Sequence, residues 1–534
     1  MNMKRYLLPS LLVCAGLALV QRRLAKPASA KTVSSSSSHD AYAAIDAYVE
    51  EQMHRLNMPG VSLAIVEGDK IVHLRGFGKA RPGGEAPTPR TPFFIGSLTK
   101  SFTALAVMQL VEAGKVDLDA PVQRYLPWFR VADPQASAQM TVRHLLNQTS
   151  GLPTSAGEIP LVDFDSSPGA TERQARALST LVLTRQVGSA FEYSNPNYSL
   201  LGLIIEAASG ESYADYVQEH IFTPLDMSHT YTSPAMARQN GLAVGHQYWF
   251  AIPFAVPNMP IPHGSLPGGL LISSSEDMAH FLIAHLNGGR YSNAQVLSGT
   301  GIDELHRGVA DFSAMGLSLG KYAMGWFVDK IGQTKLVWHG GTLPDFAAHM
   351  ALLPEQTKGV VLLFNVDHHW MNPVMAEFGA GVAALLAGEQ PAPIQFVGMI
   401  PWALRGLLLI PTLQIVGVVA TLQRLRRWRH DPISRPSGGR KWGLHILLPL
   451  IPNLLVALTL MPMLGKRRGY LKLYMPDFSW IAMVCGGFSL VWSFLRTGLV
   501  LRALRGSSSP QRFRGRSATN NQAKQLGISS RQFE

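Results

Sequence analysis

The chain has 534 residues, of which 47% are hydrophobic and 15% are charged, and its formal net charge is +12. The basic excess lies at the two ends. Residues 1–31 hold six Lys or Arg and no acidic residue, and residues 396–534 hold twenty basic and three acidic residues. The centre, residues 32–395, holds 21 basic and 32 acidic residues. An acidic centre argues against nucleic acid as a partner, and the positions of the two cysteines, Cys14 and Cys485, exclude a disulfide or a thiol nucleophile there.

Residues 1–31 have the pattern of an export leader. Lys4-Arg5 precede an apolar run, and Ala28-Ser-Ala30 offers an Ala-x-Ala cleavage site. The pattern predicts a signal peptide, while Arg22-Arg23 and the absence of acids leave an uncleaved signal anchor or an organelle transit sequence open. We expect the Ser-rich residues 32–40 to form a flexible linker.

The acidic centre predicts one folded domain over residues 41–388, large enough to bury its own core. Its first elements are an amphipathic helix over Tyr42–Leu56 and a hairpin of two strands. The strands are expected at Val61–Val66 and Lys70–Arg75, joined by a Glu-Gly-Asp turn.

The motif Ser97-Leu-Thr-Lys100 opens the next predicted element, a largely apolar helix that ends at the C-cap glycine Gly114. Residues three apart share one face of a helix, so the amine of Lys100 can take the proton of the Ser97 hydroxyl. A serine at a helix start also benefits from the helix dipole and has a free backbone N–H. The alternative is that Ser97 is an N-cap and Lys100 is a solvated residue of the first turn.

The second motif is Tyr193-Ser-Asn195. Here Tyr193 would supply a second proton-transfer group and Asn195 an amide that holds a substrate. The alternative is that both are turn residues of a Tyr-Ser-Asn-Pro-Asn-Tyr sequence. This part of the chain is rich in predicted helices, with clear examples at Leu200–Ala208 and Met278–Leu286.

Second copies of these motifs occur at Ser318-Leu-Gly-Lys321, Tyr291-Ser-Asn293 and His306-Arg-Gly308, in a different order and within a Gly- and Ser-rich stretch. Ser318 also lies in a Gly-x-Ser-x-Gly sequence typical of the α/β-hydrolase nucleophile elbow, which needs a strand before it and a helix after it. A predicted strand follows instead, so this alternative ranks lower. Its candidate acid and bases are Asp345, His349, His368 and His369.

The third motif, His339-Gly-Gly341, follows a predicted strand over Lys335–Trp338 and could supply backbone N–H groups to a developing oxyanion. The alternative is a strand end that needs unusual backbone angles. Two more strands are predicted after it, at Ala347–Leu353 and Gly359–Asn365. A loop with the sequence Asp367-His368-His369 follows, and a helix over Pro373–Leu386 closes the domain. Because no third ligand at metal-site spacing accompanies the two histidines, no metal and no cofactor are predicted.

Taken together, these motifs resemble those of the serine β-lactamase and penicillin-binding-protein superfamily. The resemblance is to the class C-like branch with D-alanyl-D-alanine carboxypeptidases, D-aminopeptidases and esterases, and it covers roughly residues 41–388. Four longer stretches carry it beyond the short motifs: Phe94–Ala104, Thr141–Pro153, Pro267–Asp277 and Leu352–Val361.

The resemblance implies an α/β (α+β) β-lactamase/transpeptidase-like fold, with an antiparallel sheet built from both ends of the domain, flanking helices and an inserted helical lobe. The site would lie at the seam between sheet and lobe. The resemblance makes Ser97 the acylated nucleophile, Lys100 its proton acceptor, Tyr193 a proton shuttle and Asn195 a substrate-binding amide.

An oxyanion hole would form from the backbone N–H groups of Ser97 and Thr342, beside the substrate-binding residues His339 and Gly341. Many members of the superfamily carry Lys-Thr-Gly where this chain has His339-Gly-Gly341. A lysine gives a permanent positive charge for a substrate carboxylate, whereas histidine is largely neutral at pH 7. This departure puts carboxylate-bearing β-lactams in doubt as natural substrates.

After a linker at residues 389–397, three apolar stretches at about 398–422, 443–464 and 479–501 have the length of bilayer-crossing helices. Arg405 and Arg496 are expected to extend to the interface, and the alternative is a functional charge within the membrane. The loop at residues 423–442 holds seven Lys or Arg, and the tail, residues 505–534, holds six. The positive-inside rule therefore predicts that both segments are cytoplasmic.

These observations predict a multi-pass plasma-membrane protein whose extracytoplasmic domain is a serine hydrolase that cleaves an amide or ester through an acyl-enzyme. The expected partners are the lipid bilayer and a small-molecule or peptidoglycan-derived peptide substrate; small esters and β-lactams fit the same chemistry. The alternative from another class is an inactive, penicillin-binding-like membrane protein that binds or senses a ligand. The sequence does not predict the oligomeric state.

Overall fold

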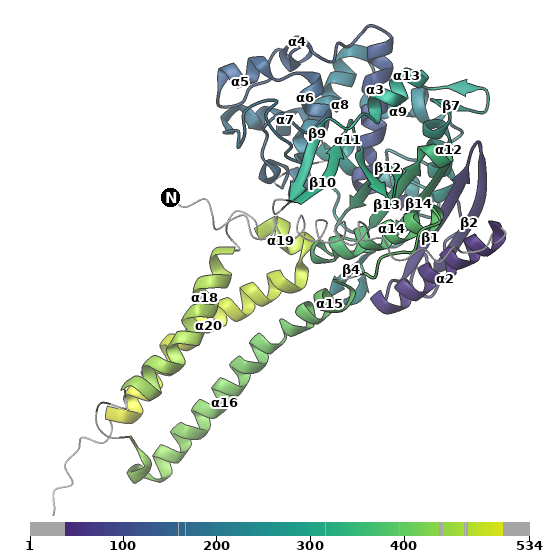
Figure 1. The fold of residues 1–534 in the computed structure, drawn as a ribbon. Helices are drawn as coiled ribbons and strands as arrows, with labels where there is room; N and C mark the ends of the chain where they lie inside the picture. Colours follow the sequence, from purple (N-terminus) through teal and green to yellow (C-terminus); the bar gives the residue numbers. More distant parts are fainter. Residues whose placement is uncertain are drawn as a thin grey trace, which may run out of the picture. The chain divides into compact units, whose positions relative to one another are not determined.

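The computed structural model describes residues 38–158, 160–165, 167–314, 317–394, 396–436, 439, 442–463, 465 and 468–505. The leader expected at residues 1–31 and the tail after residue 505 lie outside the described residues. The chain divides into two compact units (Figure 1). The first comprises residues up to Ile410 together with Met461–Met483, and the second comprises Pro411–Leu460 together with the chain from Val484 onward.

An eight-stranded antiparallel sheet forms the centre of the first unit, in the order β2-β1-β14-β13-β12-β11-β10-β9. Strand β1 pairs with both β2 and β14, for example Ala64 with Val361, so both ends of the domain contribute to one sheet as expected. The strands are β1 (Gly60–Glu67), β2 (Lys70–Gly78), β9 (Ala310–Ala314), β10 (Leu317–Tyr322), β11 (Phe327–Ile331), β12 (Thr334–Thr342), β13 (Ala347–Leu353) and β14 (Lys358–Phe364).

Helices cover both faces of the central strands, which explains why these strands are almost unbroken apolar runs. Side chains alternate between the two faces of a strand. Leu63 and Leu362 therefore join the core under α2 (Ser38–Leu56) and α14 (Asn372–Leu386). Their neighbours on the opposite face, such as Val361, join the core that contains α12 (Ser275–Leu286).

A helical lobe is inserted in the chain between β2 and β9, as the resemblance implied. Its central helix, α3 (Thr99–Glu112), is buried over nearly its whole length. It contacts α8 (Asn195–Ser209) and the short α11 (Leu266–Gly269). The ring of Phe102 in α3 stacks on that of Phe281 in α12, with centroids 3.9 Å apart, and this contact connects the lobe to the helix under the sheet.

The boundaries of two elements differ from the sequence prediction. Helix α2 begins at Ser38, four residues before the predicted start, within the expected linker. The helix expected to open at Ser97 begins as a 3-10 turn, η2 (Gly96–Leu98), that leads into α3. No side chain among the described residues caps η2 or α3, so Ser97 is not an N-cap.

Three helical stretches among the described residues are long and apolar enough to cross a membrane: Met399–His430, Gly443–Met463 and Pro476–Arg505. They correspond to the three predicted spans, and the helices in them are α15 (Phe396–Gly406), α16 (Leu409–His430), η11 (Gly443–Leu447), α18 (Leu448–Met463) and α20 (Pro476–Arg505). Large apolar side chains of the second unit point outward, for instance Leu413 and Phe494, which are about 70% exposed. An apolar exterior is what a helix needs in lipid.

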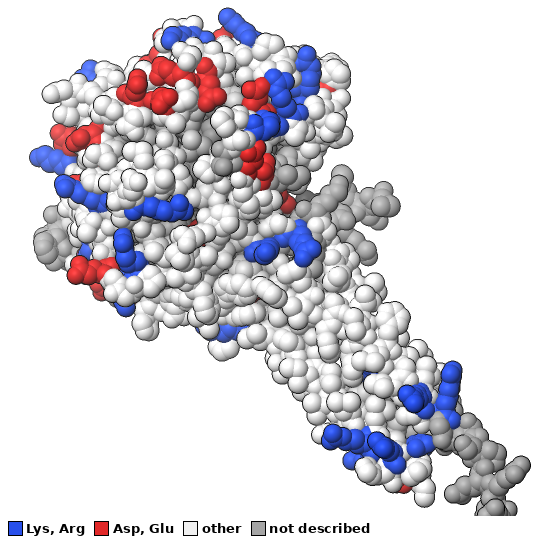
Figure 2. Space-filling model, turned by 180° about the vertical axis from the view of Figure 1, so that it is seen from behind, with Lys and Arg blue, Asp and Glu red and all other residues white. Residues whose placement is uncertain are grey.

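Arg496 does not extend to an interface as expected. It is buried in the second unit, where its guanidinium donates to Thr421 Oγ1 (3.1 Å) and to the carbonyl of His445 (2.9 Å). Hydrogen bonds to neighbouring helices satisfy this charge internally. Other basic residues lie in the last turns of α16 and α20, and basic side chains gather at one end of the helical region in Figure 2.

Candidate active site

The side chains of Ser97 and Lys100 meet as the sequence predicted. Lys100 Nζ lies 3.0 Å from Ser97 Oγ and also donates to the carbonyl of Gly268 in α11. Lys100 is buried whereas Ser97 is partly exposed. The hydroxyl is therefore open to a ligand on one side and hydrogen-bonded to an amine on the other.

The surroundings of Lys100 favour its neutral form. Because burial penalises the charged ammonium, the pKa of Lys100 falls from 10.5 to about 7. The amine also lies over the ring faces of Tyr193 and Tyr198, 5.0 and 5.6 Å from their centroids. Lys100 is thus not the solvated first-turn residue of the alternative interpretation, because its side chain is fully buried.

Tyr193 comes to the same place from the residues just before α8. Burial raises the pKa of its phenol well above the ordinary value, and a hydrogen bond with Ser97 offsets part of that rise. Its ring lies 6.3 Å from that of His339, at an angle of 45°. The structure therefore brings Ser97, Lys100, Tyr193 and His339 together from four separate elements.

Asn195 is the first residue of α8, and a buried loop fixes the segment before it. Gln148 Oε1 accepts the backbone N–H of Ser194 (2.9 Å) and the side-chain amide of Asn197 (2.5 Å). Gln148 adopts a left-handed backbone angle, φ +57°, to do so. Its role was not predicted, although it lies in the Thr141–Pro153 stretch that carried the resemblance.

Two glycines let strand β12 approach the turn that holds Ser97. A Cβ on Gly96, which has φ +54°, would lie 2.5 Å from the backbone nitrogen of Thr342. A Cβ on Gly341 would lie 2.0 Å from the Ile95 carbonyl oxygen and 3.2 Å from the backbone nitrogen of Ser97. The backbones of β12 and of this turn therefore approach each other closely at Ser97 and Thr342, whose N–H groups the resemblance assigns to an oxyanion hole.

His339 is buried in β12 as a neutral imidazole. Burial, together with the charge of Lys100, lowers its pKa to about 3. Its Nδ1–H donates to the Gly340 carbonyl (2.7 Å), which leaves Nε2 to accept the hydroxyl of Tyr322 (3.4 Å). The sequence did not single out Tyr322, because a tyrosine in an apolar strand looks like a core residue.

The second copies of the motifs do not form a comparable group. Ser318 lies inside β10, which continues to Tyr322, so it does not occupy the strand-to-helix turn of a nucleophile elbow. Lys321 faces Asp311 at 3.8 Å on the neighbouring strand. His306 is buried against His285, 3.0 Å between ring nitrogens. Tyr291 lies in a short hairpin strand, Arg290–Tyr291.

The Asp367-His368-His369 sequence has a structural role that the sequence did not indicate. His368 Nε2 lies 3.0 Å from the Asp477 carboxylate, and both side chains are fully buried. His369 Nδ1 and the hydroxyl of Tyr470 form a hydrogen bond of 3.2 Å. The two histidines therefore contact the segment after the second apolar stretch and the first turn of the third.

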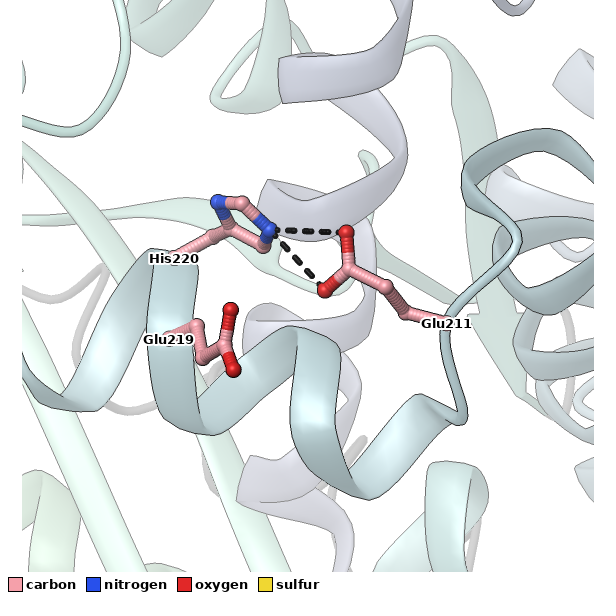
Figure 3. A group of neighbouring side chains, drawn as sticks. All are labelled: Glu211, Glu219 and His220. Atoms are coloured by element: carbon pink, nitrogen blue, oxygen red, sulfur yellow. Dashed lines mark hydrogen bonds and ion pairs between the residues drawn. The ribbon is translucent and has the colours of Figure 1, made fainter.

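A different group has the composition of a cation site. Glu211, Glu219 and His220 place one ligand atom each within 4.8 Å of the others (Figure 3). His220 Nε2 lies 3.1 and 3.2 Å from the two carboxylate oxygens of Glu211. The side chains of His220 and Glu211 are more than one third exposed, and the hydrogen bond between them accounts for their proximity.

Comparisons with known proteins show the family and the fold. A family model described as beta-lactamase matches residues 45–384. Protein flp of Staphylococcus aureus (strain MW2) is 29% identical over 342 residues, which make up 62% of this chain and 65% of that protein. The chain thus spans slightly less than two thirds of that relative's length.

Two solved structures are similar to the first unit. The octameric penicillin-binding protein homologue from Pyrococcus abyssi has a TM-score of 0.57 and 28% identity, covering 66% of this chain and 78% of that chain. The D-amino acid amidase from Ochrobactrum anthropi SV3 has a TM-score of 0.55 and 25% identity, covering 65% of this chain and 99% of that chain. The family match contains the whole site from Ser97 to Thr342, and the class that these comparisons support is a hydrolase of the β-lactamase and penicillin-binding-protein type.

Proposed function

The chain belongs to the β-lactamase family, and from this premise we propose that it is a serine hydrolase that cleaves an amide or an ester through an acyl-enzyme on Ser97. The observation that carries the proposal is the buried Lys100 amine, 3.0 Å from Ser97 Oγ, with a pKa lowered to about 7. A base whose pKa lies near the working pH combines a large neutral fraction with useful proton affinity.

In the first step, the neutral amine of Lys100 accepts the Ser97 proton while Oγ forms a bond to the substrate carbonyl carbon. Because burial raises the pKa of Tyr193, its phenol stays protonated, which favours Lys100 over Tyr193 as the base. The negative charge that develops on the carbonyl oxygen would be stabilised by the backbone N–H groups of Ser97 and Thr342.

In the second step, the bond to the leaving group breaks and the leaving nitrogen or oxygen takes a proton, which we assign to relay through the phenol of Tyr193. Asn195 would hold the substrate through its side-chain amide. A water molecule then repeats the same proton transfers in reverse to release the acid and restore Ser97.

His339 and Gly341 would border the substrate. A neutral His339 offers no fixed positive charge to a carboxylate, which supports substrates whose carboxylate is absent or bound elsewhere. Amides and esters of D-amino acids and small esters lack a free carboxylate and meet this condition, whereas carboxylate-bearing β-lactams do not; D-peptides meet it only if their terminal carboxylate is bound by other residues.

We also propose that the protein is anchored in the plasma membrane by the three stretches at Met399–His430, Gly443–Met463 and Pro476–Arg505, with the hydrolase domain outside the cytoplasm. The basic residues of 423–442 and of the tail support this orientation through the positive-inside rule. The contact of His368 with Asp477 supports it as well, because Asp477 lies in the first turn of the third stretch, which would therefore begin on the side of the hydrolase domain.

The test is covalent labelling of the full chain in detergent with a fluorophosphonate and, separately, with penicillin, followed by intact mass and peptide mapping. A fluorophosphonate adduct on Ser97 is expected, and a lasting penicillin adduct would favour carboxypeptidase-like substrates. An adduct on Ser318 would contradict the assignment. A protein that binds ligands but forms no adduct on Ser97 would be the binding or sensing protein of the alternative interpretation.

A further inference from the structure

The carbonyl of Gly268 orients the amine of Lys100. The amine hydrogen-bonds to this carbonyl and lies 3.0 Å from Ser97 Oγ. A neutral amine has two N–H donors and one lone pair, and the lone pair can take the Ser97 proton only while it points to Oγ. Because the amine is carried on a flexible four-carbon stem, an N–H bound to Gly268 fixes its rotation. The position of this carbonyl therefore matters for the proton transfer.

Two buried hydroxyl groups hold the backbone next to Gly268. Thr103 of α3 donates its hydroxyl proton to the carbonyl of Pro267, the preceding residue, at 2.7 Å. The hydroxyl of Tyr213, the first residue of α9 (Tyr213–Val217), lies 2.7 Å from Thr103 Oγ1. Since the Thr103 proton is directed to Pro267, the Tyr213 hydroxyl donates to Thr103. A relay of two hydroxyls thus ends on the backbone of α11.

The neighbouring helices restrict α11 further. Thr103 Oγ1 also lies 3.3 Å from the Thr99 carbonyl, a longer contact than the one to Pro267. Thr99 Oγ1 accepts the backbone N–H of Leu271, just after α11 (3.2 Å). A Cβ on Gly202 of α8 would lie 2.3 Å from Pro267 Cγ, so α8 packs directly on this proline. Helices α3, α8, α9 and α11 thus pack together within the helical lobe (Figure 1).

We propose that Thr103 and Tyr213 are positioning residues for the base: their hydroxyls hold the backbone at Pro267 so that the Gly268 carbonyl directs the Lys100 amine toward Ser97. The proposal rests on the acyl-enzyme chemistry given under the proposed function and adds two residues to it. Buried hydroxyls generally find partners. These two end on the backbone turn that contacts the base, which gives their pairing a consequence for the reaction.

Loss of the relay should change both the strength and the direction of the base. Thr103→Val replaces the hydroxyl by a methyl group, and the Gly268 carbonyl is then free to move away from the Lys100 amine. A carbonyl stabilises an ammonium more than a neutral amine, so its loss should lower the pH midpoint of acylation by about one unit. The plateau rate should fall about 10- to 100-fold, because the lone pair no longer points steadily at Ser97.

A shift of the midpoint would report Lys100 rather than its neighbours. Among the described residues, Tyr193, Tyr198 and His339 are titratable side chains that interact with Lys100. Burial raises the pKa of both phenols and lowers the pKa of the imidazole to about 3. The phenols therefore stay protonated and the imidazole stays neutral where Lys100 titrates.

The test is the rate of fluorophosphonate labelling of the full chain in detergent, measured against pH and reagent concentration. Each rate constant refers only to the fraction of protein that becomes labelled at the end point. In Thr103→Val the maximal rate constant and the midpoint should fall. The reagent concentration that gives half the maximal rate should stay within about twofold, because Thr103 does not contact the ligand. Tyr213→Phe should act in the same direction but less strongly, since Thr103 keeps its bond to Pro267.

Two further variants separate positioning from stability. Thr103→Ser retains the hydroxyl and should restore both the midpoint and the plateau. Tyr248→Phe is the matched control, because it removes another buried phenol hydroxyl, which donates to the Leu56 carbonyl (2.8 Å) in the core under α2 and α14. This control should leave the profile unchanged.

Unchanged midpoints and plateau rates in Thr103→Val and Tyr213→Phe would overturn the positioning role, while Ser97 labelling in the unsubstituted chain would still support the acyl-enzyme. A smaller labelled fraction with unchanged rate constants would show a purely structural role and would overturn it as well. If one of the two variants does not fold, the profile of the other decides. An unsubstituted chain that is not labelled on Ser97 would overturn both the proposed function and this inference.

Discussion

His368 and Asp477 form a fully buried hydrogen bond, 3.0 Å between Nε2 and Oδ1, although 109 residues separate them. The bond connects the residues after the central sheet to the first turn of the last apolar helix. Asp477 also accepts the backbone N–H of Phe250, so one carboxylate holds two segments of the first unit.

Asp477→Ala should therefore destabilise the first unit. The change leaves the buried His368 Nε2 and the partly buried Phe250 N–H without a partner, which we expect to cost about 2–4 kcal/mol. Thermal unfolding of the full chain in detergent measures the loss, and faster proteolytic cleavage near α19 (Arg468–Tyr474) should accompany it. Asp431→Ala, which removes a carboxylate from an exposed turn, is the control and should change the unfolding temperature little.

Ser97→Ala should abolish fluorophosphonate labelling and lower turnover by about 10⁴-fold or more, because the attacking oxygen is lost. The neighbouring copy of the motif provides the control: Ser318→Ala should retain both labelling and turnover. Intact mass and hydrolysis of an activated ester measure the two quantities. Turnover that survives in Ser97→Ala would show that another residue attacks the substrate.

The rate of acylation should depend on pH through Lys100. Because the pKa of Lys100 is lowered to about 7, the neutral amine is scarce below that pH and predominates above it. The rate of fluorophosphonate labelling should rise about tenfold per pH unit below 7 and become level above it. Lys100→Ala should lower the rate about 10²- to 10⁴-fold, and Lys321→Ala should not change it. A flat profile would contradict the role of Lys100 as the base.

Gly341→Ala should disturb the oxyanion site more than the same change one residue earlier. Its Cβ would meet rigid backbone, 2.0 Å from the Ile95 carbonyl oxygen and 3.2 Å from the Ser97 nitrogen. A displaced donor of this kind costs about 10²- to 10³-fold in kcat. Gly340→Ala is the matched control, because its Cβ would meet no atom closer than the Ala348 carbonyl oxygen at 3.9 Å. Equal kcat values for the two variants would place the oxyanion site elsewhere.

Local patterns predicted the regular elements well, because each pattern reports the burial of one strand or helix. The hairpin of β1 and β2 and the helix α12 follow from periodicity and turn residues alone. The group of Ser97, Lys100, Tyr193 and His339 could be assembled because each member lies in a recognisable motif. The family resemblance then indicated that these motifs lie together in the folded protein, which their separation along the sequence does not show.

Long-range polar contacts were beyond prediction. Nothing in the residues around His368 indicates a partner at Asp477, and the two histidines looked like a loop. Arg496 was expected at the interface because the default for an arginine near the end of a span is exposure; the acceptors offered by Thr421 and His445 come from other helices. Tyr322 was missed for the same reason, since its hydrogen bond to His339 crosses between strands.

The burial of Lys100 also makes folding a reaction that releases a proton. Between pH 7 and 10.5 the unfolded chain carries this proton, whereas most folded molecules do not. The free energy of unfolding should therefore increase with pH through this interval as far as Lys100 contributes, and the full penalty is present below it. Lys100, the residue that would activate Ser97, therefore makes the folded state more stable at alkaline than at neutral pH.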